Sequence, residues 1–65
     1  MKIIYRLGSQ TWPVGHTDRI FTENDIGKPV ELDITLKHDK GVPKLRMVQV
    51  ESVDPTKDCV CVIRA

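Results

Sequence analysis

The sequence predicts a mostly β fold: a small five-stranded SH3-like barrel or a curled antiparallel sheet, with at most one short helical turn. Two observations favour this class. Apolar residues recur at every second position in segments 2–7 and 30–37, which is the period of a half-buried strand. Segment 59–63 is apolar on both faces, and a strand covered on both sides requires a closed barrel, a second layer or a partner chain.

The length and charge of the chain limit its possible functions. Its 65 residues form a single small β domain, 1–65. A chain of this size buries only about 60% of the surface that its unfolded form exposes, so we expect a homodimer or a protein partner to add stability. The formal charge of +1 excludes bulk electrostatic attraction as the basis of nucleic-acid binding, although a local patch remains possible.

The first third of the chain is expected to contain two strands and a loop. Residues 2–7 form the first strand, with Ile3, Tyr5 and Leu7 on one face. Residues 8–16 contain Pro13 and two glycines and are expected to form a loop. Residues 18–21 are expected to add a short strand.

Residues 22–29 have the chemistry of one helical turn. Thr22 is a suitable N-cap, and Asp25 lies three residues later, where the acid of a capping box is found. Gly27 suits the left-handed conformation that ends a helix, and Pro29 prevents continuation.

A long hairpin is expected to follow. Alternation in residues 30–37 is the clearest strand signal of the chain, and Pro43 prevents pairing where the return strand begins. On that return strand Leu45 and Met47 share one face, whereas Val48 and Val50 share the other. We therefore expect a β-bulge or bend at positions 47–48, which would let the sheet curl.

Metal and cofactor sites are not expected. Cys59 and Cys61 are two apart on a strand, too far to form a disulfide with each other easily, and are interpreted as free thiols in the core. Together with His16 and His38 they offer zinc-ligand types, but the spacing matches no zinc finger or ribbon.

We also expect no enzymatic activity and no small-molecule substrate. Nothing beside the cysteines would lower a thiol pKa. Ser9, His16 and Asp18 are residue types of a catalytic triad, but no nucleophile motif surrounds Ser9. Glu31 and Asp33 lie on the expected wet face of a strand, where they keep the sheet soluble.

The expected location is the cytoplasm. No apolar run approaches the roughly 20 residues of a membrane span, and the first apolar stretch is too short for a secretory signal. Reduced cysteines fit that compartment.

Three residues are candidates for partner binding: Trp12, Tyr5 and His16. Trp12 is the only tryptophan and lies in the expected loop beside Pro13. Its ring could face a partner, or it could fold over the open end of a barrel as a plug. His16 is as readily a hydrogen-bonding residue of the loop.

The hairpin carries an alternative site. Lys37, Lys40, Lys44 and Arg46 surround a single acid, Asp39, and this excess of positive charge is sufficient to contact phosphates. Charges and a proline on an exposed hairpin equally prevent unwanted edge pairing. The hairpin also lacks the stacking aromatics of single-strand binders.

The sequence thus predicts a non-catalytic interaction module that binds a protein partner or itself through a sheet edge or the Trp12 segment. The alternative is a nucleic-acid-binding small β-barrel that uses residues 37–46. The small size would suit an accessory protein of a phage or another mobile element.

Overall fold

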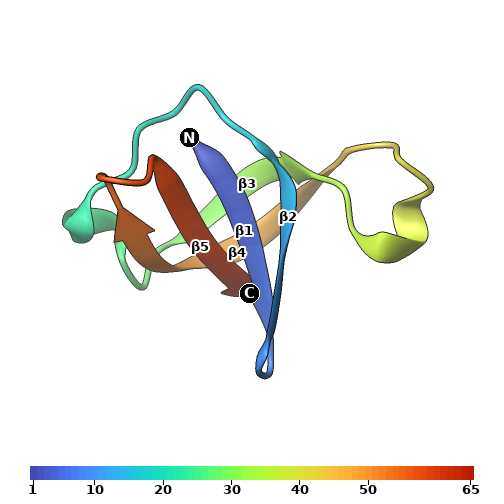
Figure 1. The fold of residues 1–65 in the computed structure, drawn as a ribbon, viewed down its shortest axis with the longest axis horizontal. Coiled ribbons are helices and arrows are strands. Elements are labelled where there is room, and N and C mark those ends of the chain that lie inside the picture. Colours follow the sequence, from blue (N-terminus) through green and yellow to red (C-terminus); the bar gives the residue numbers. More distant parts are fainter.

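The structure, a computed structural model, describes residues 1–65 as one five-stranded mixed sheet with two 3-10 turns (Figure 1). The elements are β1 (Lys2–Leu7), β2 (Gln10–His16), η1 (Glu23–Asp25), β3 (Pro29–Ile34), η2 (Lys37–Asp39), β4 (Lys44–Asp54) and β5 (Cys59–Arg64). The predicted mostly β class is confirmed, although the second turn was not predicted. Neither turn provides a helix that is long and apolar enough to cross a membrane.

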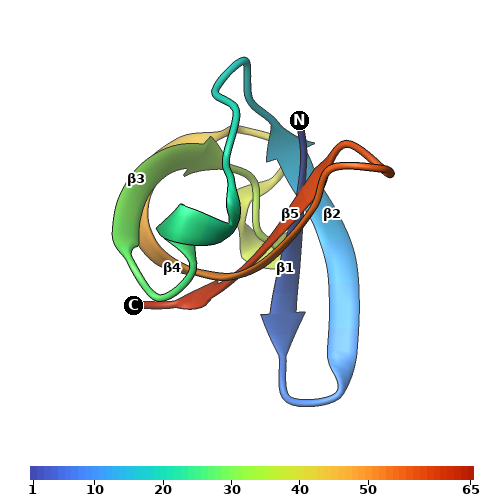
Figure 2. The same ribbon diagram turned by 90° about the vertical axis from the view of Figure 1, so that its left-hand side faces the viewer.

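The sheet has the strand order β2-β1-β5-β4-β3 and curls strongly. In Figure 2, β3 and β4 curve into a ring, and η1 lies in front of the opening of this ring. All neighbouring strands are antiparallel except β1 and β5, which are parallel. The sequence suggested an antiparallel sheet because hairpin neighbours must run oppositely, but β1 and β5 are not connected by a hairpin and escape that constraint.

The two edge strands approach each other at one end without closing the sheet. The Thr35 N–H donates to the Val14 carbonyl oxygen at 2.8 Å. Gly15 lies so close to β3 that an added Cβ would be 3.3 Å from the carbonyl oxygen of Asp33. β2 and β3 nevertheless form no ladder, so the sheet is not closed. The contacts between these two edges give it the shape of a nearly closed barrel.

Residues 10–16 form strand β2 after a turn at 8–9, and the prediction of a loop over 8–16 was wrong. Gly8 has φ of +62° and begins a two-residue turn that pairs Leu7 with Gln10. Glycine at the first central position, followed here by Ser9, is a known hairpin signal that the loop interpretation overlooked. Pro13 is tolerated because β2 is an edge strand, where a missing N–H breaks no ladder.

The strand expected at 18–21 is absent, because these residues belong to the connection between β2 and η1. The connection still contributes to the core through Phe21, which is 2% exposed. The carboxylate half of the predicted capping box is confirmed, because the Thr22 N–H donates to Asp25 Oδ2 at 2.9 Å. The Thr22 side chain makes no capping hydrogen bond, and the Asp25 N–H donates to the Thr22 carbonyl oxygen. Gly27 then adopts φ of +88° and donates its N–H to the Val50 carbonyl oxygen, which attaches the segment to β4.

Register irregularities occur in two places, neither of them at the predicted positions 47–48. One lies in the β1–β2 pairing at Val14, and the other lies in the β4–β5 pairing at Glu51. Pairing of β3 with β4 is regular throughout. Leu45 and Met47 are exposed on the outer face of β4, and the residue between them, Arg46, faces inward, so the apparent change of phase was a misreading.

Eleven buried apolar residues form the core: Met1, Ile3, Tyr5, Val14, Phe21, Leu32, Ile34, Val48, Val50, Val60 and Val62. On β5 the inner face is therefore made by Val60 and Val62. Cys59 and Cys61 lie on the opposite face, unpaired and half-buried, and not in the core as expected. The alternation of β5 between faces places them there.

The close approach of β2 to β3 leads to a test at Gly15. Gly15→Ala should lower Tm, because the new methyl group pushes against the Asp33 carbonyl oxygen. Each ~1 kcal/mol of unfolding free energy that is lost corresponds to a fall in Tm of about 4–8 °C. Gly41→Ala is the comparison: nothing lies within 4 Å of an added Cβ there, so a loss of Tm comes from its left-handed backbone, with φ of +82°. An unchanged Tm of Gly15→Ala, measured by circular dichroism, would contradict the close contact.

Candidate functional site

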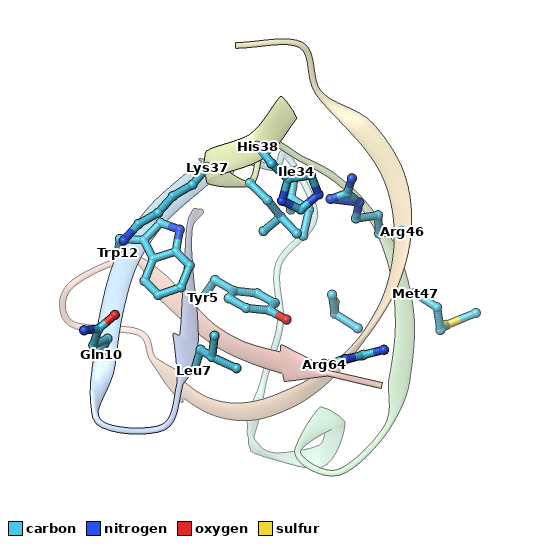
Figure 3. Close-up of a pocket in the computed structure, with 12 residues that line it drawn as sticks. Tyr5, Leu7, Gln10, Trp12, Ile34, Lys37, His38, Arg46, Met47 and Arg64 are labelled. Atoms are coloured by element: carbon cyan, nitrogen blue, oxygen red, sulfur yellow. The ribbon is translucent and has the colours of Figure 1, made fainter. Parts of the chain in front are cut away.

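A pocket of about 750 Å³ opens at one end of the curled sheet (Figure 3). η2 lies at this end, and η1 lies at the opposite end (Figure 1). Its apolar wall and floor come from β1, β2, β3, β4 and the start of the η2 loop: Tyr5, Leu7, Trp12, Ile34, Leu36, Met47 and Val48. Its polar lining is Gln10 with four basic or imidazole side chains: Lys37, His38, Arg46 and Arg64. No carboxylate lines the pocket.

Tyr5 and Trp12 form the aromatic wall. They are direct cross-strand partners on β1 and β2, with ring centroids 5.5 Å apart and ring planes inclined at 55°. Tyr5 is 7% exposed, and its hydroxyl group points into the pocket in Figure 3. Trp12 is half-buried and packs on the edge of the core, so it both covers the open end and lines the pocket.

Asp39 is the buried centre of the η2 loop and not a solvated turn residue. Its Oδ2 accepts the Leu36 N–H at 2.8 Å, and its Oδ1 accepts Arg46 Nη2 at 2.8 Å. Lys44 Nζ and His38 Nε2 lie 3.7 Å and 3.6 Å from Oδ1. The hydrogen bond from Leu36, then Arg46 and the other basic groups, hold the pKa of Asp39 below its usual value, so the carboxylate stays charged.

The four basic residues of the predicted hairpin site therefore have separate roles. Arg46 and Lys44 neutralise Asp39, and Arg46 also faces the pocket. Lys37 places Nζ 4.7 Å from the Trp12 ring centroid, in a cation–π contact. Lys40 is exposed at the end of η2 in the left-handed conformation, outside the pocket.

Two N–H-bearing nitrogens beside the pocket are buried without a hydrogen-bond partner: Trp12 Nε1 and Arg46 Nη1. A buried donor without a partner costs about 1–3 kcal/mol, and native structures leave few of them. Both belong to side chains that line the same pocket. They show that hydrogen-bond donors at this end of the molecule are not satisfied by the chain itself.

His16 does not join Tyr5 and Trp12, although the sequence grouped the three. It lies at the other end of β2, with Nε2 3.3 Å from the main-chain nitrogen of Met1. It does not line the pocket. No group of three or more His, Cys, Asp or Glu residues is arranged to hold a metal ion.

A second polar cluster lies on the outer face of the sheet. Arg6 donates to Glu51 from Nε at 2.6 Å and from Nη2, and Cys61 Sγ lies 3.7 Å from Glu51 Oε1. Burial, and then the adjacent carboxylate, raise the pKa of Cys61. The thiol therefore stays protonated and is not an activated nucleophile.

Sequence reasoning missed the roles of Asp39, which lies behind the lining, and of Arg64, and only Asp39 had a local signal. Asp39 follows Leu36 by three residues, the same spacing that identified Thr22 and Asp25 as a capping box. Arg64 had no such signal, because only the curl of the sheet brings the end of β5 to this pocket.

Comparison with protein families, curated proteins and solved structures gave no match to this chain. The site must therefore be interpreted from its own chemistry. An apolar pocket with convergent polar groups is the usual form of a binding site. The nominal triad of Ser9, His16 and Asp18 contributes no residue to it.

The lowered pKa of Asp39 predicts how stability depends on pH. A carboxylate whose folded pKa is depressed stabilises the fold above its unfolded pKa, about 3.9, and this contribution is lost as pH falls through the folded pKa. Asp39→Asn should lower Tm at pH 7 and flatten the fall of Tm between pH 5 and about pH 2. Asp33→Asn, on exposed β3 surface, is the control; equal slopes for Asp39→Asn and wild type would contradict the role of Asp39.

The Cys61 cluster gives a chemical test. Glu51→Gln removes the carboxylate that raises the Cys61 pKa, so alkylation by iodoacetamide at pH 8 should accelerate about two- to fivefold. The rate is measured by mass spectrometry in a Cys59→Ser background, so that a single thiol reacts. Glu31→Gln, on β3, should leave the rate unchanged, and the same rate in all three proteins would show that Glu51 does not govern the thiol.

Proposed function

We propose that this chain is a non-catalytic interaction module that binds a protein partner at the open end of its curled sheet. The observation that carries the proposal is the pocket beside Tyr5 and Trp12, whose volume of about 750 Å³ lies within the usual range for binding sites. A segment of a partner would seat apolar side chains against Ile34, Leu36 and Val48.

The imbalance between the two ends of the sheet supports this proposal. The end near η1 is covered by Phe21 and Met1, which are 2% and 7% exposed, and the pocket beside them is smaller, at about 490 Å³. At the other end Trp12 and Leu36 are only partly buried, and two donors lack partners. A partner that covers this end would remove more apolar surface from water, at about 25 cal/mol per Å².

Self-association has a candidate surface on the outside of β4 and the loop before it. Val42 of the loop and Leu45 and Met47 of β4 are 59%, 62% and 49% exposed. Exposed apolar residues favour a second copy or another protein when they form one patch. Met47 also lines the pocket, so a homodimer through this surface would border the partner site.

The alternative, nucleic-acid binding through residues 37–46, has less support. Lys44 and Arg46 already share Asp39, which reduces the charge available for phosphates. Lys37 lies over the Trp12 ring, so a base would have to displace it before stacking, and Tyr5 is almost fully buried. Of the four basic residues, only Lys40 is free of these contacts.

The cytoplasm remains the location that we propose. Its support is that Cys59 and Cys61 are both unpaired, as thiols generally are in a reducing compartment.

A matched pair of variants tests the pocket. Short peptides selected from a displayed library are titrated against the protein, with fluorescence of the only tryptophan, Trp12, as the signal. Leu36→Ala removes apolar surface from the pocket and should weaken binding about tenfold, whereas Leu45→Ala, on the outer face, should not. The proposal would be refuted if Leu36→Ala and Leu45→Ala bound the peptides with equal affinity. It would also be refuted if the library yielded no peptide that binds the wild type.

A second titration tests the alternative, nucleic-acid binding. Single- and double-stranded oligonucleotides are added at low and moderate salt, with light scattering as the readout. Binding that disappears at moderate salt and in Lys40→Glu would favour nucleic acid over a protein partner.

A further inference from the structure

We propose that the pocket recognises the free C-terminal carboxylate of a partner chain whose last side chain is apolar. This inference rests on the proposed protein-binding function and names the part of the partner that enters the pocket. Three features carry it: the charge of the lining, the two donors without partners, and the closed floor.

The lining is complementary to an anion. Lys37 and Arg64 line the pocket without an ion pair, Arg46 lines it with one end of its guanidinium paired to Asp39, and no aspartate or glutamate is part of the lining. Asp39, the nearest acid, is fully engaged by the Leu36 N–H and by Arg46, and it is not part of the lining. A concave, low-dielectric site with charges of one sign concentrates ligands of the opposite sign.

Two donors of the lining lack hydrogen-bond partners and are enclosed in this conformation. Asp39 fixes one end of the Arg46 guanidinium through Nη2, while Nη1 has no partner. Trp12 Nε1 also has none, and in Figure 3 it is turned toward the side of the pocket where Lys37 and Ile34 lie. A carboxylate has two oxygens with several acceptor positions and matches both kinds of donor.

Lys37 controls access to Trp12. Its Nζ lies over the indole ring, and the indole nitrogen is shielded from water in this conformation. Lys37 is itself exposed on a three-residue turn, so its side chain is free to swing away from the ring. An incoming carboxylate would exchange the cation–π contact for an ion pair with Lys37 and gain the indole donor.

The floor of the pocket favours a chain end over an acidic side chain within a segment. Ile34 and Val48, which are 0% and 2% exposed, make this floor, so the pocket ends at the core. An internal segment would have to enter and leave through the same mouth, whereas a terminus enters once. A terminal residue also carries its carboxylate next to its own side chain, which places the anion beside the apolar floor.

The test compares short peptides that end in Leu, Val or Phe, each prepared as the free acid and as the C-terminal amide. Calorimetry measures their binding to the full chain. We expect amidation to weaken binding by at least tenfold, because the amide loses the charge and one acceptor oxygen. Trp12→Phe, which keeps a ring but removes the donor, should weaken the acid several-fold and leave the amide unchanged.

Two further variants separate this site from general electrostatic attraction. Arg64→Gln removes a cation of the pocket and should weaken only the free acid, and it replaces Trp12→Phe as the deciding variant if that protein does not fold. Lys40→Gln removes an exposed cation outside the pocket and should have no effect.

The outcomes separate the two proposals. Equal binding of acid and amide that still depends on Leu36 would overturn the carboxylate inference and leave the protein-binding function intact. Free-acid binding that weakens equally in Arg64→Gln and Lys40→Gln would also overturn it. Failure of both the displayed library and these peptides to bind would remove both proposals together.

Discussion

The ion pair between Asp39 and Arg46 is the interaction on which the functional end of this molecule depends. Arg46 lies on the inner face of β4, beside Leu32, where an unpaired charge would be strongly unfavourable. Asp39 compensates that charge and also accepts the Leu36 N–H, so one carboxylate holds both β4 and the start of the η2 loop. Removing Arg46 would leave the fully buried Asp39 carboxylate without its closest cation, which is costly, whereas the Arg46 side chain is 24% exposed.

That pair also determines what kind of surface the open end presents. Because the loop is folded back, Leu36 and Lys37 lie beside Trp12 and do not extend into solvent. The negative charge is used internally, and the cations remain on the pocket lining. The same sequence segment that resembles a solvated basic hairpin thus becomes part of an apolar pocket with a positive rim.

The curl of the sheet arises at its irregularities and at the contact between its edges. Extra residues at Val14 and Glu51 increase local twist on β2 and β4, as bulges do. The hydrogen bond from the Thr35 N–H to the Val14 carbonyl oxygen then holds β2 near β3, where Gly15 lies close to Asp33. One end of the resulting barrel is filled by Phe21, and the other is left for a partner in our proposal.

The sequence alone determined the β class, the carboxylate half of the capping box of η1, and the alternation of β1 and β3, because these depend on local spacing. Tertiary structure decided the parallel β1–β5 pair, the bulge positions, the inward direction of Arg46 and the arrival of Arg64 at the pocket. Each depends on contacts between residues distant in sequence, for which period and composition carry no signal. Asp39 joins the two levels: its spacing from Leu36 is local, but its burial requires Arg46 from the neighbouring strand.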